Sequence, residues 1–313
     1  MPNTRHLLGP LERLLFLRSM NTLTGLPPDA SAKLALVAQD RFYPRGTTIC
    51  EDGVQVDSVF LIVEGTARIS WDDRTLDVGR GDGLNWLRLL SGRGTSRRSV
   101  ALEDVTALEI RATDLVDLYE ESPELLEGSI REYTRAILNM RGPLPTTEFN
   151  ELPPLGEAPT EPLGLVGKIG VVAEAGPVWR QAGMDTLVTI ARHLIEVRIP
   201  KGDSLWRMGE PADAPYWIRY GNVRCTDAEG NYVDIAAPYG LGFYDAMVGE
   251  VRCHHAIALT DLVVLRWDMG TIFGVLELMP LTAMGLLRMI AEMLSSLFDV
   301  QASQKPEVMA ESA

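Results

Sequence analysis

Basic residues are scarce in this chain. Its 313 residues include 29 lysines and arginines against 43 aspartates and glutamates, which gives a net charge of −14. A protein that binds nucleic acid neutralises phosphates with clustered lysine and arginine. We therefore expect no nucleic-acid partner, and we interpret the acidic surface as a source of solubility.

Cysteine is scarce as well. The three cysteines, Cys50, Cys225 and Cys253, are odd in number and lack the short paired spacing of metal ligands. This pattern excludes a disulfide framework and predicts no metal site. We expect three small, largely buried side chains in a reducing compartment.

Long uninterrupted hydrophobic runs are absent too. The N-terminus lacks the apolar core of a signal peptide, and the most apolar stretch, residues 281–298, contains Arg288 and Glu292. A membrane-spanning helix needs about 20 mainly apolar residues. We therefore expect a cytoplasmic protein that does not insert into a membrane directly.

What the sequence has instead is an internal repeat. Pro44-Arg45-Gly46 returns as Pro200-Lys201-Gly202, an offset of 200 − 44 = 156 residues, and after a short insertion at 227–231 the offset becomes 157. A repeat of this length is a whole folding unit, far longer than the repeat of a solenoid. We expect one duplicated domain, and divide the chain into a first domain (1–140), a Pro-rich linker (141–163), a second domain (164–300) and a disordered tail (301–313).

Each copy shows helical periodicity, then short β-rich segments, then helical periodicity again. In the first copy the β-rich segments 47–50, 58–63 and 66–70 are separated by glycine-containing turns, and a helical pattern resumes over 113–140. Short, evenly spaced strands are typical of an antiparallel barrel or jelly roll. The predicted fold class is α+β and mainly β, with two antiparallel β-roll barrels, each flanked by helices.

The hairpin sequence Phe-Leu-Ile-Val-Glu-Gly-Thr-Ala-Arg at 60–68, preceded by Pro44-Arg45-Gly46, resembles the cyclic-nucleotide-binding domain. The resemblance covers residues 8–140 and 165–300 and implies tandem jelly-roll domains, as in cAMP-receptor proteins and kinase regulatory subunits. It also implies a cAMP or cGMP ligand, held inside the roll by a phosphate-binding cassette that supplies a glycine, a carboxylate for the ribose and an arginine for the phosphate.

In the second copy the resemblance aligns this cassette with residues 240–245. Tyr244 then replaces the glycine, Asp245 keeps the carboxylate with one methylene fewer, and Arg252 matches the arginine. The alternative for Arg252 is a surface ion pair with Glu250 or Asp245. The ligand-binding residues that the resemblance implies here are Gly242, Phe243, Tyr244, Asp245, Arg252, His254 and His255.

In the first copy the cassette is more degenerate. Asn85 replaces the glycine, Trp86 replaces the carboxylate, and the position of the arginine falls on Thr95. A tryptophan cannot accept a hydroxyl proton. The weaker set of candidate ligand-binding residues is Gly83, Leu84, Asn85, Arg97 and Arg98, the two arginines being available if the loop slips.

The adjacent histidines His254 and His255 do not predict a metal site, because neighbours on a strand point to opposite faces. A protonated histidine that points inward could still assist an anion. No nucleophile with its base and no lysine-containing phosphate loop stands out, so we expect no catalytic residues and no enzyme activity.

Two functions follow from these observations. The first is a regulatory or sensory protein that binds cAMP or cGMP, mainly in its second domain, and signals to a separate effector protein. The second is a structural or adaptor protein that retains the fold without the ligand. The apolar face of the helix predicted over 281–299 also predicts a homodimer.

Overall fold

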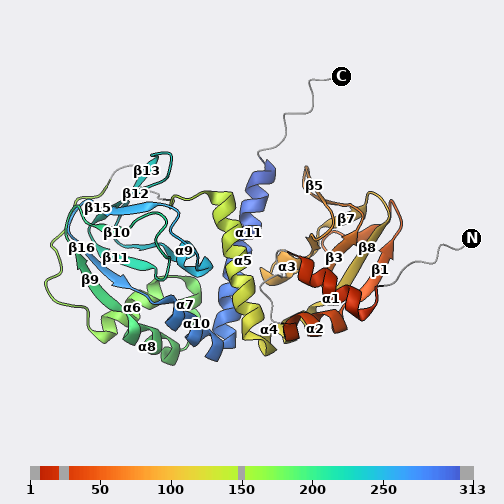
Figure 1. The fold of residues 1–313 in the computed structure, drawn as a ribbon, viewed down its shortest axis with the longest axis horizontal. Coiled ribbons are helices and arrows are strands. Elements are labelled where there is room, and N and C mark those ends of the chain that lie inside the picture. Colours follow the sequence, from red (N-terminus) through yellow and green to blue (C-terminus); the bar gives the residue numbers. More distant parts are fainter. Residues whose placement is uncertain (1–7, 21–27, 147–151, 304–313) are drawn as a thin grey trace, which may run out of the picture. The chain divides into compact units, whose positions relative to one another are not determined.

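The computed structural model describes residues 8–20, 28–146 and 152–303. It divides into two compact units (Figure 1). Unit 1 contains the residues up to Ser129 together with those from Leu287 onward, and unit 2 contains Ile130–Leu286. The division into sequence repeats and the division into compact units therefore do not coincide, because each unit takes part of a long helix from the other copy.

The first copy contains eight strands and five helices among the residues described. Its strands form two antiparallel sheets with the orders β1-β8-β3-β6 and β2-β7-β4-β5. We call this pair of sheets the first roll. In chain order the elements are α1 (Pro10–Ser19), α2 (Pro28–Val37), β1 (Gln39–Tyr43), β2 (Thr48–Cys50), β3 (Ser58–Glu64), β4 (Ala67–Trp71), β5 (Arg74–Val78), β6 (Gly83–Leu84), α3 (Trp86–Leu90), β7 (Arg98–Ala101), β8 (Val105–Arg111), α4 (Ala112–Glu121) and α5 (Pro123–Arg141).

The second copy repeats this topology strand for strand. Its sheets have the orders β9-β16-β11-β14 and β10-β15-β12-β13, and we call them the second roll. The elements are α6 (Leu165–Glu174), α7 (Pro177–Gln181), α8 (Met184–His193), β9 (Ile195–Ile199), β10 (Ser204–Trp206), β11 (Tyr216–Tyr220), β12 (Asn222–Thr226), β13 (Tyr232–Ala236), β14 (Tyr239–Leu241), α9 (Phe243–Val248), β15 (His255–Ala258), β16 (Leu262–Arg266), α10 (Met269–Leu278) and α11 (Pro280–Ser303).

The predicted fold class is confirmed, with one correction to the word barrel. Each roll consists of two separate four-stranded sheets and does not close into a barrel. In the second roll, side chains from both sheets meet in one core that includes Ile218, Val223 and Val264, all fully buried. The first roll packs Ile62 and Val105 of one sheet with Ala67 of the other in the same way. Alternation of inward and outward residues along short strands is what produces such a two-sheet core.

Two glycines at matching positions fix the turns after β3 and β11. Gly65 has φ +89° and Gly221 has φ +96°. A Cβ at either position would collide with the main-chain oxygen of the aspartate opposite, Asp104 or Asp261. The same two aspartates accept hydrogen bonds from the main-chain N–H groups of the repeated Pro-x-Gly turns, each at 2.9 Å. The repeat therefore preserves residues that the backbone requires.

The two long helices cross the boundary between repeats. Residues of α5 from Ile130 onward belong to unit 2, and residues of α11 from Leu287 onward belong to unit 1. Within unit 2, Arg131 of α5 donates hydrogen bonds to the carbonyl oxygens of Met247 and Val248 in α9, both at 3.0 Å. The helix that follows one roll therefore contacts the short helix of the other copy.

Unit 1 shows the corresponding contact at the end of α11. The carboxylate of Asp299 accepts hydrogen bonds from Arg97 at 2.6 Å and Arg93 at 2.9 Å, and Arg74 donates to its main-chain oxygen at 2.5 Å. Burial favours the neutral carboxyl, but the two arginines outweigh burial and hold the pKa of Asp299 below its ordinary value. Three cations therefore converge on one residue of α11.

Of the segment predicted as a linker (141–163), Arg141 ends α5, and the other described residues, 142–146 and 152–163, contain neither helix nor strand. The segment is nevertheless attached to the second roll. Tyr239 donates its hydroxyl to the oxygen of Thr146 at 2.8 Å, and Arg198 donates to the oxygen of Pro159 at 2.9 Å. Of the tail predicted from residue 301, α11 takes up the part to Ser303, and residues 304–313 lie outside those described.

One helix in the described residues is long and apolar enough to cross a membrane, the stretch Pro280–Val300 of α11, with a mean hydropathy of 1.4. Length and composition are its only membrane-like features, and a core helix shares them. Side chains along it, including Leu286, Leu287 and Ile290, are buried in the structure. The charged Asp299 near its end is held by the arginines described above.

Candidate functional site

The second cassette contains Gly242, which lies between β14 and α9. Gly242 adopts the left-handed conformation with φ +72° and serves as the N-cap of α9. A Cβ here would lie 2.6 Å from Nη1 of Arg252 and 3.0 Å from the Trp206 ring. The conformation and the crowding both require glycine at this position.

Strand pairing corrects the alignment of this cassette. Leu84 pairs with Phe60 in the first roll, and Leu241 pairs with Tyr216 in the second. The residue that follows each leucine, Asn85 or Gly242, is left-handed and caps a short helix. The close-approach glycine is therefore kept as Gly242, and was wrongly assigned as replaced at Tyr244.

The same register moves the ribose-carboxylate position. It falls on Phe243, the counterpart of Trp86, and Asp245 lies two residues further along α9, where the first copy has Arg88. The repeat offset of 157, applied to Asn85, would have found this register from the sequence alone.

Arg252 is buried, with 2% of its surface exposed. Its guanidinium donates to the main-chain oxygens of Gly242, at 3.3 Å, and Ala214, and it stacks over the Trp206 ring at 4.2 Å. Burial lowers its pKa, and the charge of Asp245 partly opposes this effect. The surface ion pair with Glu250 does not form, because Glu250 accepts from Arg135 at 2.8 Å instead.

Asp245 and His254 lie beside Arg252 and are also buried, with 4% and 3% of their surfaces exposed. The thiol of Cys253 donates to Oδ1 of Asp245 at 3.2 Å and lies 3.6 Å from Nδ1 of His254. Burial lowers the pKa of His254, against the opposing charge of Asp245. Burial also raises the pKa of the Cys253 thiol to about 12.

The remaining candidates of the second copy point elsewhere. His255 is half-buried on β15, and its Nδ1 accepts from the main-chain N–H of Met208 at 3.2 Å. The Tyr244 ring lies under the guanidinium of Arg141 at 4.7 Å, and burial raises the pKa of its hydroxyl. The structure thus gathers Gly242, Asp245, Arg252 and His254, and separates Tyr244 and His255 from them. Sequence reasoning missed Trp206 and Cys253, which complete the group.

In the first roll, the side chain of Asn85 makes the contact that Arg252 makes in the second roll, although Asn85 is the sequence equivalent of Gly242. Its amide lies 3.4 Å from both the oxygen of Ser58 and Sγ of Cys50. At the repeat offset these correspond to Ala214 and Trp206, the groups that the Arg252 guanidinium contacts. One side-chain donor therefore serves the same carbonyl in each roll, from a different position in the chain.

The position of Arg252 corresponds to Ser96, one residue after the predicted Thr95. Gly53 donates its N–H to the oxygen of Ser96, and Gly209 donates to that of Arg252, at 3.0 and 2.9 Å. Ser96 is buried and donates its hydroxyl to the oxygen of Val54 at 3.1 Å. The first roll therefore has no arginine at this position.

The other first-copy candidates lie around this loop. Gly83 and Leu84 form β6, with Leu84 fully buried. Arg97 binds Asp299 and stacks over Trp71 at 4.1 Å, whereas Arg98 is exposed on β7. Arg88, missed from the sequence, donates to the oxygen of Thr95 at 2.8 Å, and burial together with the charges of Arg97 and Arg93 lowers its pKa.

A comparison with known families decides what this fold is. Residues 40–122 match the model of the cyclic nucleotide-binding domain. The first roll is a cyclic nucleotide-binding domain. The second roll has the same strand order, so the predicted recognition of cyclic nucleotide-binding domains in tandem is confirmed.

Several known proteins are similar to parts of this tandem. A cyclic nucleotide-gated potassium channel of Rhizobium etli is 31% identical over 98 residues, covering 31% of this chain and 28% of the channel. An uncharacterized NTE family protein of Mycobacterium bovis is 27% identical over 134 residues, 42% of this chain and 23% of that protein. The chain thus spans less than a third of the length of these relatives.

Among solved structures, the regulatory domain of Toxoplasma gondii PKA with cAMP aligns over 94% of this chain and 97% of that chain. Its sequence identity is 14% and its TM-score is 0.35.

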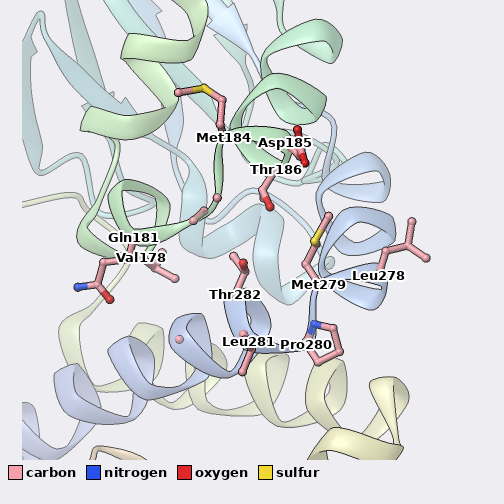
Figure 2. A pocket seen from close by; sticks show the side chains of 13 residues that line it. Val178, Gln181, Met184, Asp185, Thr186, Leu278, Met279, Pro280, Leu281 and Thr282 are labelled. Carbon is pink, nitrogen blue, oxygen red and sulfur yellow. The ribbon is translucent and has the colours of Figure 1, made fainter.

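A pocket among the described residues lies away from both cassettes. It has a volume of about 590 Å³ and lies between the start of α8 and the turn from α10 to α11 (Figure 2). Met184, Thr186, Met279 and Thr282 are among its lining residues. It contains none of the predicted ligand-binding residues.

Proposed function

We propose that this protein is a regulatory protein whose second cyclic nucleotide-binding domain binds cAMP or cGMP and signals to a separate effector protein. The observation that carries the proposal is the buried Arg252 beside Gly242. A guanidinium fork is suited to the two exocyclic oxygens of a cyclic phosphate. The first roll offers Asn85 and Ser96 in its place, and an amide and a hydroxyl carry no charge.

Binding would exchange the acceptors of Arg252. In the structure these are the neutral main-chain oxygens of Gly242 and Ala214. A phosphate oxygen is a stronger acceptor for a guanidinium than a neutral carbonyl, and the difference grows in a buried site. The anion would also remove the cost of burying this cation alone.

The contacts of α9 supply a route for the signal. Met247 and Val248 in its last turn accept hydrogen bonds from Arg131 of α5, and Arg135 of α5 forms an ion pair with Glu250 at 2.8 Å. A shift of α9 on ligand binding would therefore act on α5. Coupling of this kind needs two arrangements whose balance the ligand changes.

The alternative function, an adaptor that binds no nucleotide, is favoured by a different observation. Two donors of Arg252, Nη1 and Nη2, already have acceptors, and Phe243 and Trp86 stand where the family has the ribose carboxylate. In that case Arg252 stabilises the second roll by joining Gly242, Ala214 and Trp206. The two functions differ in whether nucleotide displaces these contacts.

Calorimetric titration and thermal unfolding with cAMP and with cGMP test the proposal. We expect wild type to bind one equivalent, and a ligand at 100 times its Kd adds about 2.7 kcal/mol to stability. Arg252→Ala should abolish this response. The matched control is Arg224→Ala, because Arg224 lies in the same roll and pairs with Asp234 at the surface.

Two results would overturn the proposal. One is a wild type that shows no response to either nucleotide at millimolar concentration, which selects the adaptor. The other is an Arg252→Ala variant that keeps its far-UV spectrum and still binds with wild-type affinity.

Homodimerisation through helix 281–299 stays a prediction. In the structure Leu281 is 84% exposed, whereas Leu287 and Leu294 are 0% and 3% exposed. The exposed apolar face of this helix that a partner could contact is therefore narrower than the apolar face that the sequence predicts. Sedimentation of the full chain, wild type against Leu281→Glu, tests it, and an unchanged mass would count against this interface.

A further inference from the structure

Three side chains of different chemistry meet at the second cassette. Asp245 lies on α9, and Cys253 and His254 immediately precede β15. Their ligand atoms all lie within 4.8 Å of one another. Sγ of Cys253 is 3.2 Å from Oδ1 of Asp245 and 3.6 Å from Nδ1 of His254, and Oδ2 of Asp245 is 3.9 Å from Nδ1 of His254.

Hydrogen bonding within the protein does not account for this arrangement. Asp245 is 4% exposed, and Oδ2 has no hydrogen-bond partner among the described residues. Its other oxygen accepts only from a thiol, which is a weak donor. Arg252 directs its donors to carbonyl oxygens instead. A buried carboxylate with so few partners is costly unless a cation is bound there.

We propose that Asp245, Cys253 and His254 bind one divalent transition-metal ion, with Zn²⁺ as the best fit. Zinc prefers four ligands in a tetrahedron and accepts sulfur, nitrogen and oxygen donors together. With zinc–ligand bonds of about 2.0–2.3 Å, the edges of that tetrahedron are about 3.3–3.8 Å. The Sγ–Oδ1 and Sγ–Nδ1 separations lie close to these values, and the 3.9 Å separation joins His254 to the second carboxylate oxygen, so binding needs Asp245 and His254 to move toward a shared ion.

The net charge of the metal-bound site is compatible with its burial. One carboxylate and one thiolate together neutralise a divalent cation, although Arg252 lies nearby. On binding, the Cys253 S–H bond breaks, the sulfur forms its bond to the metal and the proton passes to solvent. Cys253 is only half-buried, which leaves a way in for the ion. The oxygen of Pro143, 3.4 Å from its sulfur, or a water completes the fourth position.

The metal would join two segments that the chain connects only through a loop. Asp245 belongs to the cassette helix α9, and Cys253 directly follows Arg252. A bound ion would therefore fix the loop that carries Arg252 against α9. This inference does not depend on nucleotide binding, because it needs only the three donors.

Titration of the metal-free full chain with Co²⁺, without nucleotide, tests the proposal. Cobalt reports a tetrahedral site by its visible bands and a thiolate ligand by a charge-transfer band in the near ultraviolet. We expect both bands to saturate at one equivalent, and one equivalent of Zn²⁺ to remove them. Cys253→Ser and His254→Gln should each weaken binding more than about 10-fold, since even the loss of an outer-shell partner costs that much.

Matched controls separate this site from other thiols and histidines. Cys225→Ala removes a cysteine from the same roll, and His255→Gln removes the neighbouring histidine, whose ring contacts Met208 instead. Both should keep the wild-type spectrum. A wild type without the charge-transfer band, or a band that survives Cys253→Ser, overturns the proposal. Failure of nucleotide binding would leave these spectra unchanged, so the two proposals fail separately.

Discussion

The two cassettes share one backbone and solve the same packing problem with different residues. In the second roll Gly242 leaves room for the guanidinium of Arg252, which reaches the oxygen of Ala214. In the first roll Asn85 is the equivalent of Gly242, and its own amide lies 3.4 Å from the equivalent oxygen, that of Ser58. The glycine and the arginine of the second roll therefore form one unit, and the first roll has exchanged both.

The two cassettes also differ in where their charged side chains lie. The third residue of the cassette helix is Arg88 in the first roll and Asp245 in the second. In the first roll the acidic side chain near the cassette comes from α11, where Asp299 forms ion pairs with Arg93 and Arg97. The second roll carries its acid on α9 itself. Duplication preserved the main chain while the charges were placed differently.

The largest expected effect on stability comes from the glycines that the two rolls share at the turns after β3 and β11. Gly65→Ala and Gly221→Ala each force a Cβ against a main-chain oxygen at positive φ. The left-handed conformation costs about 1–2 kcal/mol and the overpacking about 1–3 kcal/mol more. We expect both variants to lose about 2–5 kcal/mol in urea-induced unfolding. A loss in only one of them would show that the rolls differ at this turn.

An intermediate effect tests whether the glycine and arginine act as a unit. Gly242→Asn should destabilise the protein by about 1–3 kcal/mol, because the new side chain collides with Arg252 and Trp206. The double variant Gly242→Asn, Arg252→Ser recreates the pair found in the first roll and should recover most of that loss. A double-mutant cycle by denaturant unfolding measures the coupling. Additive effects would contradict the comparison.

This double variant also sharpens the nucleotide experiment. It removes the guanidinium and leaves an asparagine to serve the oxygen of Ala214. We expect it to fold and to show no response to either cyclic nucleotide. A retained response would place the nucleotide outside the second cassette.

A smaller effect is expected where α11 meets the first roll. Asp299→Asn leaves Arg93 and Arg97 without their anion and should cost about 1–2 kcal/mol. The pKa of Asp299 is lowered in the folded protein. Its contribution is therefore present above the unfolded pKa and is lost as the pH falls through the folded value. In that acidic range, the free energy of unfolding in urea should fall more steeply with decreasing pH for wild type than for Asp299→Asn. Parallel pH dependences of the two proteins would contradict this role.

Much of the fold was predictable from local pattern. The repeated Pro-x-Gly turns and Gly65 with Gly221 mark backbone positions that admit few residues, so the duplication and the strand-rich fold class could be inferred correctly. The second cassette was misaligned by the resemblance, which matched Phe243 to a family phenylalanine. Strand pairing, in which Leu241 lies opposite Tyr216, gives the true register.

The candidate site was predictable only in part. Arg252 and Asp245 were found, but their neighbours were not. Trp206 stacks under Arg252 although it precedes it by 252 − 206 = 46 positions in the chain. The spacing of Cys253 in the sequence did not match that of metal ligands. Contacts of this kind depend on how β10, α9 and the loop before β15 pack together, which no local periodicity records.

The sequence by itself determined the duplication, the strand-rich fold class and the turns, because each of these depends on local backbone preferences and on alternating burial. Only the tertiary structure decided which helix contacts which cassette, since the hydrogen bonds from α5 to α9 and from the first roll to Asp299 join residues more than a hundred positions apart. It also decided the partners of Arg252 and Asp245. Burial makes those partners matter, because a charge removed from water must be satisfied by whatever the fold brings beside it.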